Sequence, residues 1–333
     1  MKKTILLFLG LFVGIFSAFA QMMPDSTYQV CAYWEVGDKY NYQVEESKFK
    51  VKNGTDTTDI EISSHILTLE IVDATDSTYR VRAKTDDYRN SNADKDARTD
   101  DLLQRFGNKP IEFETNEYGV FKRILITDED IQAAYPLLDA IADQTANEQD
   151  MDAVARDALK KMMRAMFTKD KIISTYMEEF TPLLTFHGLH VSKDTEIEYE
   201  TEVPSFLGDG STIRMKGLLW VDDEWTDEYS IVLHNDLETD KEGMQDFMKT
   251  YLSTLASTLG DSVNTQGLEE AEDILRNGDF SRTDSTVGEI HLDSGWPIYY
   301  DYEQVVSVKG QGETLEQVKT KTIELILEDE EEE

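Results

Sequence analysis

The amino-acid sequence predicts an α+β fold in which a long, curved antiparallel sheet, similar to a half-barrel, is covered by amphipathic helices. Several segments alternate apolar with polar residues, which is typical of strands with one buried and one solvated face. Turn-forming residues separate these segments. Two other segments repeat apolar residues at i, i+3 and i+4, which is typical of amphipathic helices. Helices are the only other elements that could cover the apolar face of the sheet.

Three strands are predicted in the first part of the chain, between residues 40 and 88. Their alternating apolar residues are Tyr40, Tyr42, Val44, Ile60, Ile62, Leu67, Leu69, Ile71, Tyr79, Val81 and Ala83. Asn53-Gly54 predicts a hairpin turn between the first two strands, and residues 73–77 predict the next turn. After a polar stretch and a short helix near residues 102–106, a further hairpin is expected from Ile111 to Ile126.

A helical block is predicted over residues 128–186. Thr127 and Asp130 match the signature of an N-terminal cap. One face of the block carries an apolar stripe of Met151, Val154, Ala155, Ala158, Leu159, Met162, Met163 and Met166. This spacing predicts an amphipathic helix.

The second part of the chain repeats this order of elements. Strands are expected near residues 196–203, 212–221, 229–233 and 320–327, with a hairpin turn at 293–297. Between them, Thr239 and Glu242 match a capping box. The apolar stripe behind that cap comprises Met244, Phe247, Met248, Tyr251, Leu252, Leu255, Ala256 and Leu259, and a short helix is expected near 268–275. An internal pseudo-repeat is one interpretation of the order, and chance recurrence is the other.

The chain start predicts a secretory signal peptide over residues 1–20. Lys2 and Lys3 precede an apolar run, and Ala18-Phe19-Ala20 matches a cleavage site. We therefore expect an exported protein, periplasmic or extracellular, with cleavage near Ala20 and no membrane span in the mature chain. Residues 21–327 are expected to form one β-rich domain with helical insertions, with lobes at 21–190 and 191–327 as the alternative. Residues 328–333 form an acidic tail.

The composition excludes several classes of partner. The chain has 32 basic and 68 acidic residues, a net charge of −36. Loss of Lys2 and Lys3 with the leader makes the mature charge −38, from 30 basic and 68 acidic residues. Such a chain repels nucleic acid and anionic lipid headgroups. Cys31 is the only cysteine, so no internal disulfide forms, and its apolar surroundings predict burial.

The sequence contains no motif that predicts catalysis or a cofactor. A Gly-x-Ser-x-Gly elbow, a His-Glu-x-x-His pair and a phosphate-binding glycine loop are all missing. His187 and His190 are the one local histidine pair, which would hold a transition metal only if a carboxylate joined them. The acidic turn at residues 222–228 lacks the ordered spacing of a calcium loop. We expect neither enzyme activity nor a bound metal.

Several stretches resemble a family of uncharacterised secreted proteins from Bacteroidota. They are Trp34-Glu-Val-Gly37-Asp-Lys-Tyr40-Asn-Tyr42, Phe113-Glu-Thr-Asn-Glu-Tyr-Gly119, Leu292-Asp-Ser-Gly295-Trp296-Pro297, and Thr320-Lys-Thr-Ile-Glu-Leu-Ile326. The resemblance implies a Gram-negative envelope protein and transfers no activity or site residue. The strand plan is also similar to that of periplasmic lipoprotein carriers, whose incomplete barrels hold acyl chains beneath helices, and this is an analogy at the level of fold.

Four short motifs resemble the Asp-Ser/Thr sites of protein O-glycosylation in Bacteroidota. They begin at Asp56, Asp76, Asp261 and Asp284, and all four are expected near turns or element ends. A glycan would fit at such places. The motif is short enough for chance matches.

The methionine-rich stripes suggest a binding function. Methionine surfaces adapt to varied apolar ligands. The plainer interpretation is that the stripes seal the apolar face of the sheet. The leading hypothesis is a non-catalytic binding protein for a lipid or another hydrophobic or amphipathic ligand, with a cavity lined by Tyr40, Tyr42, Leu67, Leu69, Met162, Met166 and Phe247. The alternatives are a secreted, O-glycosylated module for a protein partner and a hydrolase with an unrecognised site.

Overall fold

The computed structural model describes eight stretches of chain and a few single residues. The stretches are residues 27–91, 110–166, 168–193, 195–205, 211–222, 229–239, 279–310 and 312–327, and the single residues are Thr226, Gly243, Met244, Phe247 and Thr250. The predicted leader, the short helices near 102–106 and 268–275 and the acidic tail lie outside these residues. So do most of the helix predicted after Thr239 and the motif at Asp261.

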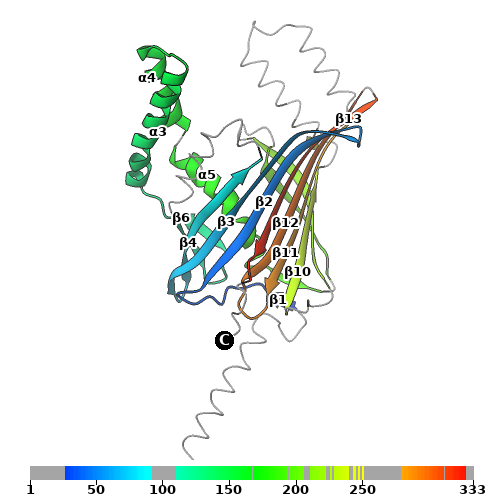
Figure 1. Cartoon of the computed structure of the whole chain (residues 1–333). Coiled ribbons are helices and arrows are strands. Elements are labelled where there is room, and N and C mark those ends of the chain that lie inside the picture. The colour runs from blue at the N-terminus through cyan, green and yellow to red at the C-terminus, as the bar shows by residue number, and fades with distance from the viewer. Residues whose placement is uncertain are drawn as a thin grey trace, which may run out of the picture.

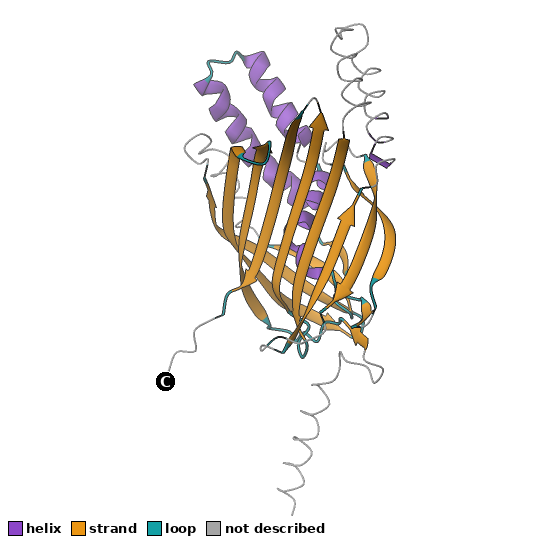
Figure 2. Ribbon diagram, turned by 90° about the vertical axis from the view of Figure 1, so that its right-hand side faces the viewer, coloured by secondary structure: helices purple, strands orange, loops and turns teal. Residues whose placement is uncertain are grey.

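Eleven antiparallel strands form one curved, unclosed sheet (Figures 1 and 2). Its order is β6-β5-β4-β3-β2-β13-β12-β11-β10-β9-β8. The first half comprises β2 (Lys39–Lys52), β3 (Asp56–Thr75), β4 (Thr78–Asn90), β5 (Ile111–Asn116) and β6 (Phe121–Ile124). The second half comprises β8 (Ile197–Pro204), β9 (Thr212–Val221), β10 (Ser230–Glu238), β11 (Asp279–His291), β12 (Pro297–Gly310) and β13 (Glu313–Leu325).

Each half is a meander, and the pairing of β2 with β13 joins the two halves. The register runs from Tyr42 opposite Leu325 to Lys52 opposite Leu315. Both stretches considered as separate lobes therefore contribute strands to the same sheet.

The predicted strands and hairpins are confirmed in type and order, and many strands are longer than expected. Asn53 and Gly54 have positive φ angles of 52° and 69°, as the two central residues of a type I′ turn require. The predicted turn at 293–297 connects β11 to β12. The glycosylation-like motif at Asp284, however, lies in the middle of β11 rather than near a turn. Asp284 is buried there in an ion pair, whereas Ser285, whose hydroxyl would carry the sugar, is exposed on the opposite face of the strand.

The helices cover the sheet less than the sequence predicts. The helical block consists of α3 (Asp128–Glu148), α4 (Ala153–Met166), α5 (Lys169–Phe180) and the short helix η1 (Pro182–Leu184). A capping box of Thr127 and Asp130 begins α3, as predicted. Of the described side chains of this block, those of α5 and η1 pack in the first core cluster on the sheet. The helices α3 and α4 stand beyond the end of the sheet (Figure 1).

The apolar stripe of α4 therefore does not seal the sheet. Ion pairs from Lys160 to Asp143 (2.7 Å) and from Arg164 to Asp139 hold α4 against α3. The side chains of Val154 and Met162 remain 79% and 54% exposed. Hydrophobic spacing predicted the helix, but it does not determine which element the apolar face of the helix packs against, because that depends on tertiary contacts. Within the described chain, no helix combines the length and the apolar character needed to cross a lipid bilayer.

Three hydrophobic clusters occupy the concave face of the sheet. The first covers β2 to β6, extends to β12 and β13, and includes Phe180 of α5 and Leu183 and Leu184 of η1. The second lies on β9, β10 and β11 beneath Phe186 and the small sheet of β1 (Thr27–Gln29) and β7 (His190–Ser192). The third combines Ile213 and Met215 of β9 with Met244 and Phe247. Cys31 is buried, as predicted.

Gly295 lies at a close contact between the hairpin that joins β11 to β12 and the segment that follows β1. Its φ is +68°, and an added Cβ would lie 1.9 Å from the carbonyl oxygen of Cys31. Gly54 has a similar φ of +69° with open space around it. We expect Gly54→Ala to lower the free energy of unfolding by about 1 kcal/mol. Gly295→Ala should lower it by about 3 kcal/mol, because a steric clash adds to the backbone strain. Urea denaturation measures both, and equal losses would contradict the close approach.

Candidate functional site

The floor of the concave face contains four of the seven predicted binding residues. Tyr42, Leu67 and Leu69 are buried in the first cluster, and Tyr40 packs against that cluster. The Tyr42 hydroxyl donates to the carbonyl oxygen of Pro297 at 3.0 Å, and the ring of Tyr40 lies 4.4 Å from that of Trp296. These side chains pack closely with one another and with Trp296. They form a solid floor.

The other three predicted residues lie elsewhere. Phe247 belongs to the third cluster, with Ile213, Met215 and Met244. Met162 is exposed on α4. Met166 is the last residue of α4, and its side chain is outside the described set. The structure therefore does not bring the seven residues to one place, and a shared cavity lined by them stays a prediction.

A buried charge network lies above the floor, where α5 contacts the sheet. Lys321 of β13 is 4% exposed and pairs with Glu46 of β2 at 2.9 Å. Its ammonium group also donates to the backbone carbonyl of Glu178 at 3.1 Å and lies 3.4 Å from the Glu179 carboxylate of α5. His65 of β3 pairs with the other oxygen of the Glu179 carboxylate. Four charged or titratable groups thus connect α5 to three neighbouring strands.

The network fixes the protonation states of Glu179 and Lys321. Burial alone would raise the pKa of Glu179, but the hydrogen bond from His65 and the charge of Lys321 outweigh burial and lower the pKa to about 2. Burial opposes the charged form of Lys321, yet the carboxylates of Glu179 and Glu46 raise its pKa overall. Glu179 and Lys321 are therefore ionised at neutral pH, and α5 is held by charge-assisted contacts.

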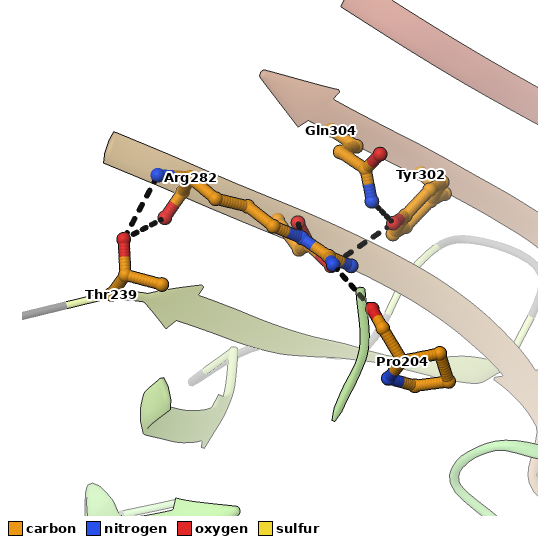
Figure 3. A network of polar contacts seen from close by, with 6 residues as sticks. Pro204, Thr239, Arg282, Tyr302 and Gln304 are labelled. Carbon is orange, nitrogen blue, oxygen red and sulfur yellow. Dashed lines mark hydrogen bonds and ion pairs between the residues drawn. The ribbon is translucent and has the colours of Figure 1, made fainter. Parts of the chain in front are cut away.

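A second buried network lies further along the concave face (Figure 3). Arg282 and Asp284 of β11 are each 5% exposed and form a two-pronged ion pair with distances of 2.7 and 2.6 Å. Arg282 also donates to the carbonyl oxygen of Pro204 at 2.7 Å, and the Tyr302 hydroxyl donates to Asp284 at 3.0 Å. Thr239 accepts from the backbone N–H of Arg282 at 2.9 Å. Every charge here has a partner, so the network ties β8 and the end of β10 to β11 and β12.

Between the two networks, the concave face carries a set of residues that, within the described chain, lie outside the three hydrophobic clusters, apart from Phe280, which packs against the third. We call this set the concave patch. It comprises Lys48, Lys50 and Lys52 of β2, Leu315, Gln317 and Lys319 of β13, Gln304, Val306 and Val308 of β12, and Phe280 of β11. These positions follow the buried Tyr42, Val44 and Ile323 in steps of two, so they face the same side.

The concave patch changes in character from one strand to the next. One row of directly opposed residues across β2, β13, β12 and β11 consists of Lys52, Leu315, Val308 and Phe280. Another row, two rows away on the same face, consists of Lys48, Lys319, Gln304 and Asp284. The side on β2 is cationic, and the side on β12 and β11 is largely apolar. Leu315 is 48% exposed, and Val306 and Val308 are half-buried. The sequence analysis missed these residues, although the alternation of lysines at 48, 50 and 52 placed them on one strand face.

The histidine pair considered for a metal does not converge. His187 is buried and its Nε2–H donates to the carbonyl oxygen of Gly295 at 2.8 Å, whereas His190 is exposed and contacts the Thr27 hydroxyl at 2.7 Å. Burial lowers the pKa of His187 to about 4, against the opposing effect of that hydrogen bond. No group of three or more potential metal ligands occurs within the described stretches. Most of the acidic turn at 222–228 lies outside them.

The face of the sheet opposite the concave patch has an open hollow of about 840 Å³ over β8 to β11. Its lining includes Glu198, Glu200, Asp236 and Glu238 together with Lys216 and Ser285. The Ser285 hydroxyl donates to Asp236 at 2.7 Å. The hollow is acidic and polar, which is unsuitable for an apolar ligand.

No protein-family model matches this chain, and no curated protein sequence matches it. Among solved structures, a structure described as "lipid-protein interactions in lipovitellin" aligns with 88% of this chain at 9% identity and a TM-score of 0.40. The aligned part is 25% of the lipovitellin chain. At this level of similarity the alignment carries no argument about function.

The network beneath α5 predicts a specific acid sensitivity. The folded pKa of Glu179, about 2, is below its ordinary value of 4.5. Its contribution to stability is therefore present above pH 4.5 and is lost as the pH falls toward 2. We expect Glu179→Gln to lower the free energy of unfolding at pH 7 by on the order of 3 kcal/mol and to flatten its decline between pH 4.5 and 2.

Glu178→Gln is the matched control, since the exposed Glu178 contributes only its backbone carbonyl to the network. Urea denaturation across the pH range measures both variants. The separate decline due to His187, from pH 6.5 toward 4, should persist in both. An unchanged slope below pH 4.5 in the Glu179 variant would contradict the assignment.

Proposed function

We propose that this protein binds an elongated apolar or amphipathic ligand on the concave face of its open sheet, without catalysing a reaction. The observation that carries the proposal is the concave patch, in which apolar side chains stay accessible on the inner face of the sheet. The predicted floor residues Tyr40, Tyr42, Leu67 and Leu69 support this surface from below. In this proposal they support the binding surface and do not line it.

The apolar part of the concave patch has a free-energy reason to bind a ligand. Leu315, Val308 and Phe280 lie side by side on three neighbouring strands. Burial of apolar surface stabilises a complex by about 25 cal/mol for each Å² removed from water. Four strands spaced about 4.8 Å apart span roughly 14 Å from β2 to β11, which gives room for a chain laid across them.

The proposal places this binding outside the cytoplasm. Residues 1–20 have the features of a signal peptide, and cleavage near Ala20 would release a mature chain into the periplasm or beyond. The Bacteroidota resemblance is consistent with that location. The intact mass of the protein recovered from a Bacteroidota host tests both cleavage and covalent sugar.

A protein-interaction module is the second candidate, and a surface feature favours it. Ile60 and Ile62 of β3 are 53% and 50% exposed, and they stand near the tip of the sheet. The motifs at Asp56 and Asp76 lie at the two ends of the same strand, where a glycan would be accessible. Exposed apolar side chains of this kind can contact a partner protein.

Native mass spectrometry of residues 21–333, purified without detergent and followed by organic extraction, distinguishes the candidates. Ligand binding predicts a stoichiometric, extractable lipid. A ligand-free protein that carries only covalent sugar would contradict the binding proposal and favour the interaction module.

A paired substitution on β12 tests the position of the ligand. Val306 faces the concave patch and Val305 faces the opposite side of the same strand. We expect Val306→Asn to weaken binding of a fluorescent fatty-acid analogue about 3- to 10-fold, because an apolar contact is lost. Val305→Asn carries the same change in strand propensity and should bind like the wild type. Equal effects of the two substitutions would place the ligand elsewhere.

A further inference from the structure

We propose that the ligand is an anionic amphiphile whose acidic head group binds between Lys48 and Lys319, with its apolar chain lying across β13, β12 and β11. This inference rests on the proposed function and specifies its ligand class. The head is a carboxylate or a phosphate, since both accept hydrogen bonds from ammonium groups.

The two lysines are cross-strand neighbours. Lys48 of β2 lies directly opposite Lys319 of β13, and both side chains face the concave side. Directly opposed residues on one face have Cβ atoms about 5 Å apart, and like charges there are destabilising. An anion between the two ammonium groups would remove this repulsion and make hydrogen bonds to both.

The other cations nearby are already occupied. Lys50 pairs with Asp59 at 2.8 Å and Lys52 with Glu313 at 2.9 Å. Lys321, in the next row, is buried between Glu46 and Glu179. Arg282 is paired with Asp284.

Lys48 and Lys319, by contrast, have no ion-pair partner within the described chain. Glu61 of β3 is opposite Lys48 in the register but does not form an ion pair with it. The pair is therefore available to an acidic ligand. The net charge of −36 repels anions at long range, so binding of an acidic head group would depend on the local charge of this lysine pair.

Apolar surface begins one row away from this pair, at Val306, and continues in the row beyond it. Two steps along β13 from Lys319 is Gln317, and two more is the exposed Leu315, whose row continues through Val308 to Phe280. Gln304, beside Lys319, already donates its amide to the Tyr302 hydroxyl at 2.8 Å, so the two lysines supply the hydrogen bonds to the head group. Cationic and apolar surfaces thus adjoin on one face, which matches the two ends of an amphiphile.

The test compares palmitate with monopalmitin, a neutral amphiphile with the same acyl chain, by titration calorimetry of the mature protein below micelle-forming concentrations. We expect the wild type to bind palmitate about 10-fold more tightly, because hydrogen bonds to charged groups are stronger than neutral ones. The preference should shrink as salt is added, since both lysines are accessible to solvent.

The double variant Lys48→Gln and Lys319→Gln should lose the preference while still binding monopalmitin. Lys309→Gln is the control, because Lys309 is an exposed residue of β12 on the opposite face, and the preference should persist in it. Equal binding of palmitate by the wild type and the double variant would overturn the head-group assignment and leave the proposed function standing. Failure of the wild type to bind either amphiphile would overturn both.

Discussion

The pairing of β2 with β13 is the constraint on which the rest of the structure depends. It brings together the first and last strands of the large sheet, and without it each meander would end in an unpaired edge. The register is maintained by side chains as well as by backbone, since the hydroxyls of Ser47 and Thr320 lie 2.7 Å apart across it. The packed floor, the network under α5 and the concave patch all include residues from both sides of this junction. A shift of one residue would turn every one of these side chains to the other face.

The two buried charge networks divide the concave face into regions with different roles. Taking charges out of water is costly, and each network offsets that cost through several hydrogen bonds. The Glu179–Lys321 network holds α5 above the first cluster, and the Arg282–Asp284 network ties β8 to β11. Because both are satisfied internally, neither offers a charge to a ligand. The accessible polar and apolar groups between them, on β2, β13 and β12, are what remains for binding.

The sequence predicted what depends on local pattern, and it missed what depends on distant contacts. Period-two alternation and turn residues such as Asn53-Gly54 identified the strands and hairpins, because both signals lie within a few residues. The predicted floor residues Tyr42, Leu67 and Leu69 are buried together for the same reason. The opposition of Lys48 to Lys319 joins positions far apart in the chain, so no local signal gives it. The exposure of Met162 likewise follows from the docking of α4 on α3, which helical spacing does not determine.

The most direct test of the account is photo-crosslinking of the mature protein with a palmitate analogue that carries a diazirine near the end of its chain, followed by peptide mapping. A ligand on the concave face predicts labelled peptides from the end of β12, the start of β13 and the start of β11, near Val308, Leu315 and Phe280. Competition with unlabelled palmitate should remove the label. Labelling confined to the opposite face, around Ile60 and Ile62, or labelling that palmitate does not compete away, would contradict the claim that the concave face is a binding surface.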